Sequence, residues 1–182
     1  MKKNLRPRKQ KGFTLIEVMV AMVVMAVGIL SLASIFTQGL KSSNQSQIQY
    51  IAQQKAQEAM ESIFTARDTR LLTSAQINNV SNGGIFKDGP QPLLGPGPDG
   101  LFGTADDDAN NPDSIVVGPG KDNVFGTADD VTIPLTPWMT RTIVIAPSAN
   151  TPNLKTITVT LNWTYGGEAF QYQIASFISN FS

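Results

Sequence analysis

A long uncharged stretch near the N-terminus constrains this chain more than any other feature. Residues 18–36 are almost entirely apolar. As a helix rising 1.5 Å per residue, they would extend about 28 Å, close to the thickness of a bilayer core. Six basic residues precede the stretch, and the next basic residue after it is Lys41. The positive-inside rule therefore predicts a cytoplasmic N-terminus and export of the remaining chain.

Glu17 is the one charged residue between residues 13 and 40. A conventional secretory signal has an apolar region of about 7–15 residues, shorter than this one, although Leu32-Ala33-Ser34 could serve as its cleavage site. A plain membrane anchor explains the length but gives no reason for a carboxylate. A carboxylate costs about 2.5–3.5 kcal/mol at the centre of a span and less near its edge. Glu17 is therefore expected to have a partner.

The residues around Glu17 indicate what that partner is. The string KGFTLIEV, from Lys11 to Val18, resembles the type III signal of prepilins and pseudopilins. The resemblance implies that a prepilin peptidase/methyltransferase cuts after Gly12 and methylates Phe13. It also implies that Glu17 pairs with the freed amine during filament assembly. A glycine admits the backbone into a narrow site, and paired opposite charges offset each other's desolvation.

The continuation of the apolar stretch, Met19 to Leu30, is similar to PilV-type minor pilins. Many major pilins carry a proline in this helix and a disulfide-closed loop near the C-terminus, and this chain has neither. The resemblance therefore implies a minor pilin or pseudopilin. Other pilins or pseudopilins and the pilus assembly platform would be its partners, in a filament anchored in the bacterial inner membrane and reaching the periplasm or cell exterior.

The helix is expected to continue beyond the membrane. Residues 41–82 contain no glycine or proline, and small apolar residues recur there at near-helical spacing. From Phe13 to about Arg67 the helix would run roughly 80 Å. Its stripe is too poor in large apolar residues for a coiled-coil dimer, so we expect it to pack on a globular domain. The stripe consists of Ile48, Ala52, Ala56, Ala59 and Ile63.

The C-terminal region has strand patterning that ends in a predicted hairpin. Apolar and polar residues alternate on both sides of Gly166-Gly167, a pair suited to a two-residue turn with positive φ. With these two residues as the turn, apolar residues would face each other on one side of the sheet. The predicted pairs are Trp163 with Phe170, Leu161 with Tyr172, and Val159 with Ile174.

The order of elements predicts an α+β fold. It resembles the type IV pilin fold, in which a long N-terminal helix, half transmembrane and half soluble, packs on a small antiparallel C-terminal sheet. The expected segments are a basic leader (1–12), a transmembrane and assembly helix (13–40), the soluble half of that helix (41–80), a Gly/Pro/Asp-rich loop region (81–135) and an antiparallel sheet (136–182).

The loop region contains a duplicated segment. GPGPDGLFGTADD (95–107) recurs as GPGKDNVFGTADD (118–130), with ten of thirteen positions identical. Such identity predicts a repeated structural unit. We refer to residues 95–107 as repeat 1 and to residues 118–130 as repeat 2.

Each repeat offers three carboxylates and free carbonyls, the hard oxygen ligands that Ca²⁺ prefers. The spacing does not match an EF-hand. The alternative is a pair of solvated Asp-Gly turns, with Phe102 and Phe125 tucked into the core. Calcium is thus a possible cofactor, with the candidate ligands Asp99, Asp106, Asp107, Asp122, Asp129 and Asp130.

Composition restricts the function further. The chain has no histidine or cysteine, which excludes imidazole catalysis, thiol nucleophiles and the usual zinc sites. Behind the basic leader the chain carries an excess of acidic residues, so nucleic acid binding is not expected. No nucleophile motif with an activating base is visible, and we predict no enzymatic role. The alternatives to a minor pilin are a calcium-dependent adhesive tip module on a pilin anchor and a pseudopilin of a type II secretion system. A tip adhesin would project both repeats, whereas an assembly subunit would pack them.

Overall fold

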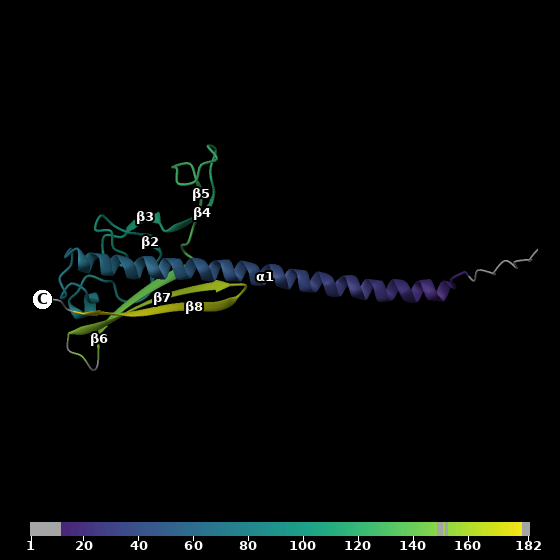
Figure 1. Ribbon diagram of the computed structural model, residues 1–182, viewed down its shortest axis with the longest axis horizontal. Helices are drawn as coiled ribbons and strands as arrows, with labels where there is room; N and C mark the ends of the chain where they lie inside the picture. Colours follow the sequence, from purple (N-terminus) through teal and green to yellow (C-terminus); the bar gives the residue numbers. More distant parts are fainter. Residues whose placement is uncertain (1–11, 149–150, 152, 180–182) are drawn as a thin grey trace, which may run out of the picture. The chain divides into compact units, whose positions relative to one another are not determined.

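The computed structural model describes residues 12–148, 151 and 153–179. Most of the expected leader, residues 1–11, and the last three residues of the expected sheet segment lie outside this range. The chain divides into two compact units, residues 1–46 and residues 47–182, which are described separately. In chain order the elements are α1 (Leu15–Asp68), the 3-10 helix η1 (Val80–Asn82), β1 (Gln91–Pro92), β2 (Leu94–Gly95), β3 (Asp108–Pro112), β4 (Ser114–Gly118), β5 (Val131–Pro134), β6 (Met139–Pro147), β7 (Leu154–Tyr165) and β8 (Glu168–Ser179) (Figure 1).

The first unit contains the N-terminal part of α1, whose apolar side chains are exposed. An 18-residue window of this helix has a mean hydropathy of 2.6, and none of it is buried within the protein. By length and composition α1 can cross a membrane. The hydroxyls of Ser31 and Thr37 donate to the carbonyls of Val27 and Ser34, each at 2.8 Å. These polar groups therefore need no water in a hydrocarbon environment.

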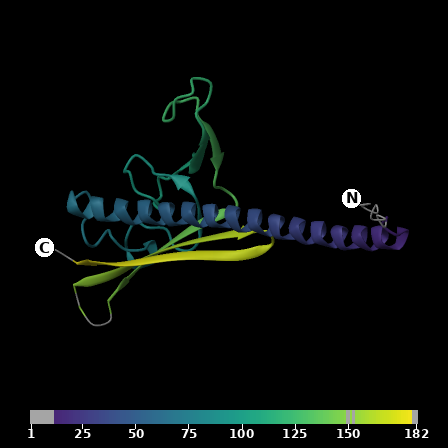
Figure 2. The ribbon, with the colours of Figure 1, turned by 45° about the vertical axis from the view of Figure 1, so that its right-hand side comes forward.

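The second unit packs the C-terminal part of α1 on an antiparallel sheet. The sheet has the strand order β1-β6-β7-β8 and lies along the helix (Figures 1 and 2). Four residues of the predicted stripe, Ala52, Ala56, Ala59 and Ile63, are fully buried, and Ile48 packs at the edge of the core. Small side chains allow the helix to approach the sheet closely. The predicted α+β architecture, a long apolar helix on a C-terminal antiparallel sheet, is confirmed.

The β7–β8 hairpin has the predicted register. Trp163 pairs with Phe170, Leu161 with Tyr172, and Val159 with Ile174. Gly166 and Gly167 have φ angles of 61° and 84°, which glycine adopts without the steric cost of a Cβ. The Trp163 and Phe170 rings stack with their centroids 6.0 Å apart. The two-glycine turn and the alternation of apolar and polar residues were therefore sufficient to predict this pairing.

The segments between helix and sheet differ in detail from the expected division. The helix ends at Asp68, close to the expected end near Arg67. Residues 69–78 of the expected helical segment 41–80 form turns and bends, Asn79 forms a β-bridge with Phe86, and Val80 begins η1. Strands in the loop region are short, and β1 joins the main sheet beside β6. Two further pairs, β2–β3 and β4–β5, form separate two-stranded sheets. Backbone pairings in these short strands link distant residues, which local patterning does not reveal.

Candidate functional site

The predicted processing site lies just before the helix. Gly12 and Phe13 are outside α1, and the Phe13 side chain is 83% exposed. A Cβ added at Gly12 would meet no described atom within 4 Å. Packing against the described residues therefore does not require glycine at this position. A requirement imposed by a processing enzyme is consistent with this geometry.

Thr14 caps the helix at its first turn. Its hydroxyl accepts a hydrogen bond from the Glu17 backbone N–H at 3.3 Å, and its carbonyl accepts from the same N–H at 3.1 Å. Thr14 and Glu17 have the spacing of a capping box, in which a hydroxyl satisfies an otherwise unpaired amide. A carboxylate in the first turn also interacts favourably with the helix dipole. Our sequence analysis missed the cap, although the threonine–glutamate spacing could have indicated it.

The two repeats form the same turn. In repeat 1, Asp99 accepts from the Leu101 N–H at 2.8 Å, and Asp107 accepts from the Gly103 N–H at 2.8 Å. In repeat 2, the equivalent Asp122 and Asp130 accept from the equivalent amides at 2.9 and 2.7 Å. The predicted structural unit is thus present twice. Its bonds join Asp99 to Leu101, Asp107 to Gly103, Asp122 to Val124 and Asp130 to Gly126.

The middle carboxylate of each repeat is held by a threonine. The Thr104 hydroxyl donates to Asp106 at 2.7 Å, and the Thr127 hydroxyl donates to Asp129 at 2.8 Å. These hydroxyl bonds are the largest cause of a lowered pKa at both Asp106 and Asp129. Both carboxylates therefore remain ionised at neutral pH.

In the structure, the six candidate calcium ligands accept hydrogen bonds that stabilise these turns. Each of the six carboxylates accepts a backbone or threonine hydrogen bond within its own repeat. No group of three or more acidic side chains within the described residues is placed to hold a metal ion. Burial, followed by the charges of Asp106 and Asp107, raises the pKa of Asp99. Calcium binding remains a prediction from the sequence.

Repeat 1 is docked on the core of its own chain. Leu101 is 1% exposed, and the Arg141 guanidinium lies 4.5 Å from the centroid of the Phe102 ring. Gly103 lies against Ile143, whose Cδ1 would be 2.8 Å from an added Cβ. The Gly103 carbonyl accepts from the Lys87 N–H at 2.7 Å. Repeat 1 is therefore part of the folded domain.

Repeat 2 is not docked. It connects β4 and β5, and this hairpin stands away from the main sheet (Figures 1 and 2). Val124 and Phe125, the equivalents of Leu101 and Phe102, are 55% and 66% exposed. A Cβ added at Gly126 would meet no described atom within 4 Å. The suggestion that both phenylalanines are tucked into the core therefore holds partly for Phe102, which packs against the core, and is wrong for Phe125.

Comparison with known proteins gives one match. Residues 7–33 match the model of the prokaryotic N-terminal methylation motif, which belongs to the type IV pilin and pseudopilin family. No curated protein and no solved structure matches the chain. The matched residues include Gly12, Phe13, Thr14 and Glu17.

Proposed function

We propose that this chain, whose N-terminal segment carries the methylation motif of type IV pilins and pseudopilins, is a minor pilin or pseudopilin. Pilins are structural proteins without enzymatic activity, and the motif implies processing by a prepilin peptidase and assembly with other pilins. The main support is the coincidence of this motif with an exposed apolar helix that is long enough to cross a membrane. The chain would be anchored in the inner membrane, with its second unit exported, and incorporated into a filament through the assembly platform.

The structure around the motif supports this role. An added Cβ at Gly12 would meet no described atom within 4 Å, Phe13 is exposed, and Glu17 lies in the first turn of α1. After cleavage behind Gly12, the new amine on Phe13 would lie at the start of the apolar helix. An amine there can pair with the Glu17 carboxylate of a neighbouring subunit, which offsets the cost of placing either charge in a low dielectric.

Mass analysis of the mature N-terminus tests the proposal. The expected product begins at methylated Phe13. Gly12→Val should block cleavage, because a branched side chain next to the scissile bond obstructs a narrow site. Gly39→Val is the matched control, since an added Cβ meets no described atom within 4 Å there either. A mature chain that begins at Met1, or beyond Ala33, would exclude the prepilin assignment.

The exposure of repeat 2 favours a second candidate. An adhesive module on a pilin anchor would present such a projecting unit to an extracellular surface. Repeat 1 is docked, however, and an adhesive tip was expected to project both copies. Purification of the filaments with their accompanying pilins would distinguish this candidate, and a type II secretion pseudopilin, from a pilus subunit.

A further inference from the structure

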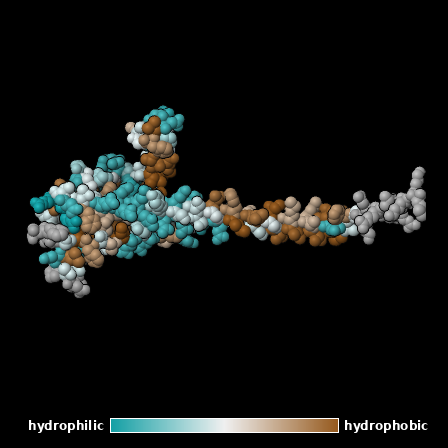
Figure 3. Space-filling view, in the orientation of Figure 1, coloured by the Kyte–Doolittle hydropathy of each residue, from teal (hydrophilic) through white to brown (hydrophobic). Residues whose placement is uncertain are grey.

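Repeat 2 carries an apolar surface that its duplicate buries. The two repeats share their turn hydrogen bonds, yet Leu101 and Gly103 are buried, while Val124 and Gly126 are exposed. Along β4 and β5 the apolar surface continues with further exposed residues, visible as brown on the projecting hairpin in Figure 3. These are Val116, Val117, Val131 and Ile133. Exposed apolar clusters of this kind mark interaction surfaces.

Repeat 1 shows what such a unit contacts when it docks. Its apolar pair lies against buried aliphatic residues, and the Arg141 guanidinium lies over the Phe102 ring. Burial lowers the pKa of Arg141, and the charges of Asp113 and Asp107 oppose this lowering. Arg141 is itself only 2% exposed in this contact, so a surface that binds repeat 2 should combine aliphatic side chains with a guanidinium able to lie over the Phe125 ring.

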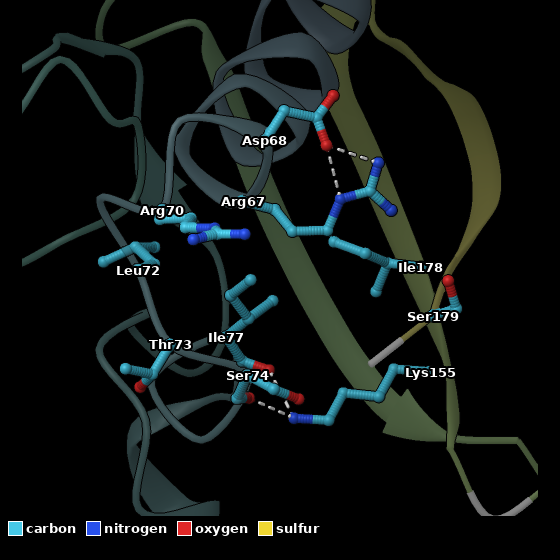
Figure 4. Close-up of a pocket in the computed structure, with 10 residues that line it drawn as sticks. All are labelled: Arg67, Asp68, Arg70, Leu72, Thr73, Ser74, Ile77, Lys155, Ile178 and Ser179. Carbon is cyan, nitrogen blue, oxygen red and sulfur yellow. Dashed lines mark hydrogen bonds and ion pairs between the residues drawn. The ribbon is translucent and has the colours of Figure 1, made fainter. Parts of the chain in front are cut away.

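The second unit has a cleft with this composition, between the end of α1 and the end of β8. It has a volume of about 750 Å³ (Figure 4). Ile77 and Ile178, which are both buried, form apolar parts of its wall. Arg67 and Arg70 also line it. Arg67 is ion-paired with Asp68, with its Nη2 2.7 Å from the Asp68 Oδ1. The cleft is large enough for a phenylalanine side chain and its neighbours.

The charges of the two surfaces are complementary. The cleft is lined by three basic residues and by one carboxylate, Asp68. Because Asp68 is paired with Arg67, the excess positive charge is that of Arg70 and Lys155. Lys155 donates to the carbonyls of Ser74 and Ile77 at 2.6 and 3.0 Å and thereby holds the cleft wall. Repeat 2 has three carboxylates and one lysine. Opposite charges at the rim of an apolar contact favour encounter and determine its orientation.

We propose that repeat 2 of one copy inserts Val124 and Phe125 into the Arg67–Arg70–Lys155 cleft of a second copy of this chain. The contact joins two different surfaces, so it is heterologous and leaves one free surface of each kind on the pair of copies. Its area is small for an independent dimer. It therefore adds to the association of copies already held together in a membrane or filament. The proposal rests on the proposed function in that the second copy is a neighbouring filament subunit.

Engineered disulfides test this contact, because the chain has no native cysteine. One full-length copy carries Val124→Cys, and a differently tagged full-length copy carries Ser74→Cys at the cleft. The matched control replaces Val124→Cys with Val144→Cys, another exposed valine, located on β6. Both pairs are co-produced in membranes and filaments and oxidised mildly. We expect a mixed disulfide at least about tenfold more abundant for the Val124 pair than for the control, because disulfides form only between closely placed Cβ atoms.

A charge reversal provides the second measurement. Arg70→Glu in the cleft copy should lower the mixed disulfide several-fold, whereas Lys87→Glu, the same charge change outside the cleft, should not. A yield equal to the Val144 control, or a disulfide to a different protein, would overturn the proposal. Sheared filaments separate the two claims: copies present in filaments without the disulfide refute the contact alone. A disulfide in membranes without incorporation into filaments refutes the filament role.

Discussion

Asn79 caps the part of the β6 edge that no strand covers, using its side chain. Its amide donates to the Ile143 carbonyl at 2.8 Å, and its side-chain oxygen accepts from the Ile145 N–H at 2.7 Å. On this edge β1 pairs only with residues 140 and 141 of β6. At residues 143 and 145 the Asn79 side chain makes the hydrogen bonds that a neighbouring strand would otherwise make. Asn79 is 5% exposed. Buried backbone groups need partners, and this residue satisfies two of them.

Asn79→Leu should therefore destabilise the second unit strongly. It leaves two buried backbone groups unpaired, at about 1–3 kcal/mol each, so we expect a loss of about 2–6 kcal/mol in the free energy of unfolding. Denaturant unfolding of the full chain in detergent, followed by circular dichroism, measures it. Asn82→Leu, at an exposed position in η1, is the control and should change little. Equal midpoints for the two variants would contradict the role assigned to Asn79.

At the scale of elements, the repeats show how far local sequence determines structure. Both copies form the same aspartate-closed turn although one is docked and the other exposed. Gly97 and Gly120 occupy equivalent positions at which an added Cβ would collide with Asp106 and Asp129. Hydrogen bonds within a few residues are therefore sufficient to form the turn.

Asp99→Asn tests the electrostatics of repeat 1 and the calcium prediction together. The pKa of Asp99 is raised in the folded state, so above its ordinary pKa near 3.8 the ionised form costs stability. Asparagine removes this charge and can still accept from the Leu101 N–H. In chelator at neutral pH we expect the variant to melt at or slightly above the midpoint of the unaltered chain. A midpoint below that of the unaltered chain would show instead that the charge of Asp99 stabilises the fold.

The same melts repeated in millimolar calcium decide whether the repeats bind the metal. A ligand at a hundredfold above its Kd stabilises the folded state by about 2.7 kcal/mol. Such a gain in the unaltered chain, absent from Asp99→Asn/Asp122→Asn, would establish calcium sites. Equal midpoints in calcium and chelator would leave the repeats as turns stabilised by hydrogen bonds.

At the scale of the whole molecule, we propose that Glu17 couples the N-terminal apolar helix to filament assembly. Glu17→Ala makes the segment more apolar, so membrane insertion should persist, whereas the proposed partner of the Phe13 amine is lost. We expect the variant in the membrane fraction at the normal level and reduced several-fold in sheared filaments. Glu61→Ala, the same substitution in the exposed later part of α1, is the control. Equal recovery of both variants in filaments would refute the assembly role.

Periodicity and turn chemistry by themselves determined much of this protein. The buried alanine stripe of α1 and the register of the β7–β8 hairpin follow from spacings of two to four residues, and the repeated turn follows from bonds within nine residues. The methylation motif is likewise a continuous string. Such features are predictable because the interacting groups are close together in the chain.

The tertiary structure decided which repeat is docked and where distant segments meet. Asn79 reaches residues 64 and 66 positions away, and the cleft combines the end of α1 with β7 and β8. The two repeats are nearly identical in sequence, so no local signal could show that Phe102 packs below Arg141 while Phe125 remains exposed. That difference depends on which surfaces the flanking strands bring to each copy, and it arises only when the whole chain has folded.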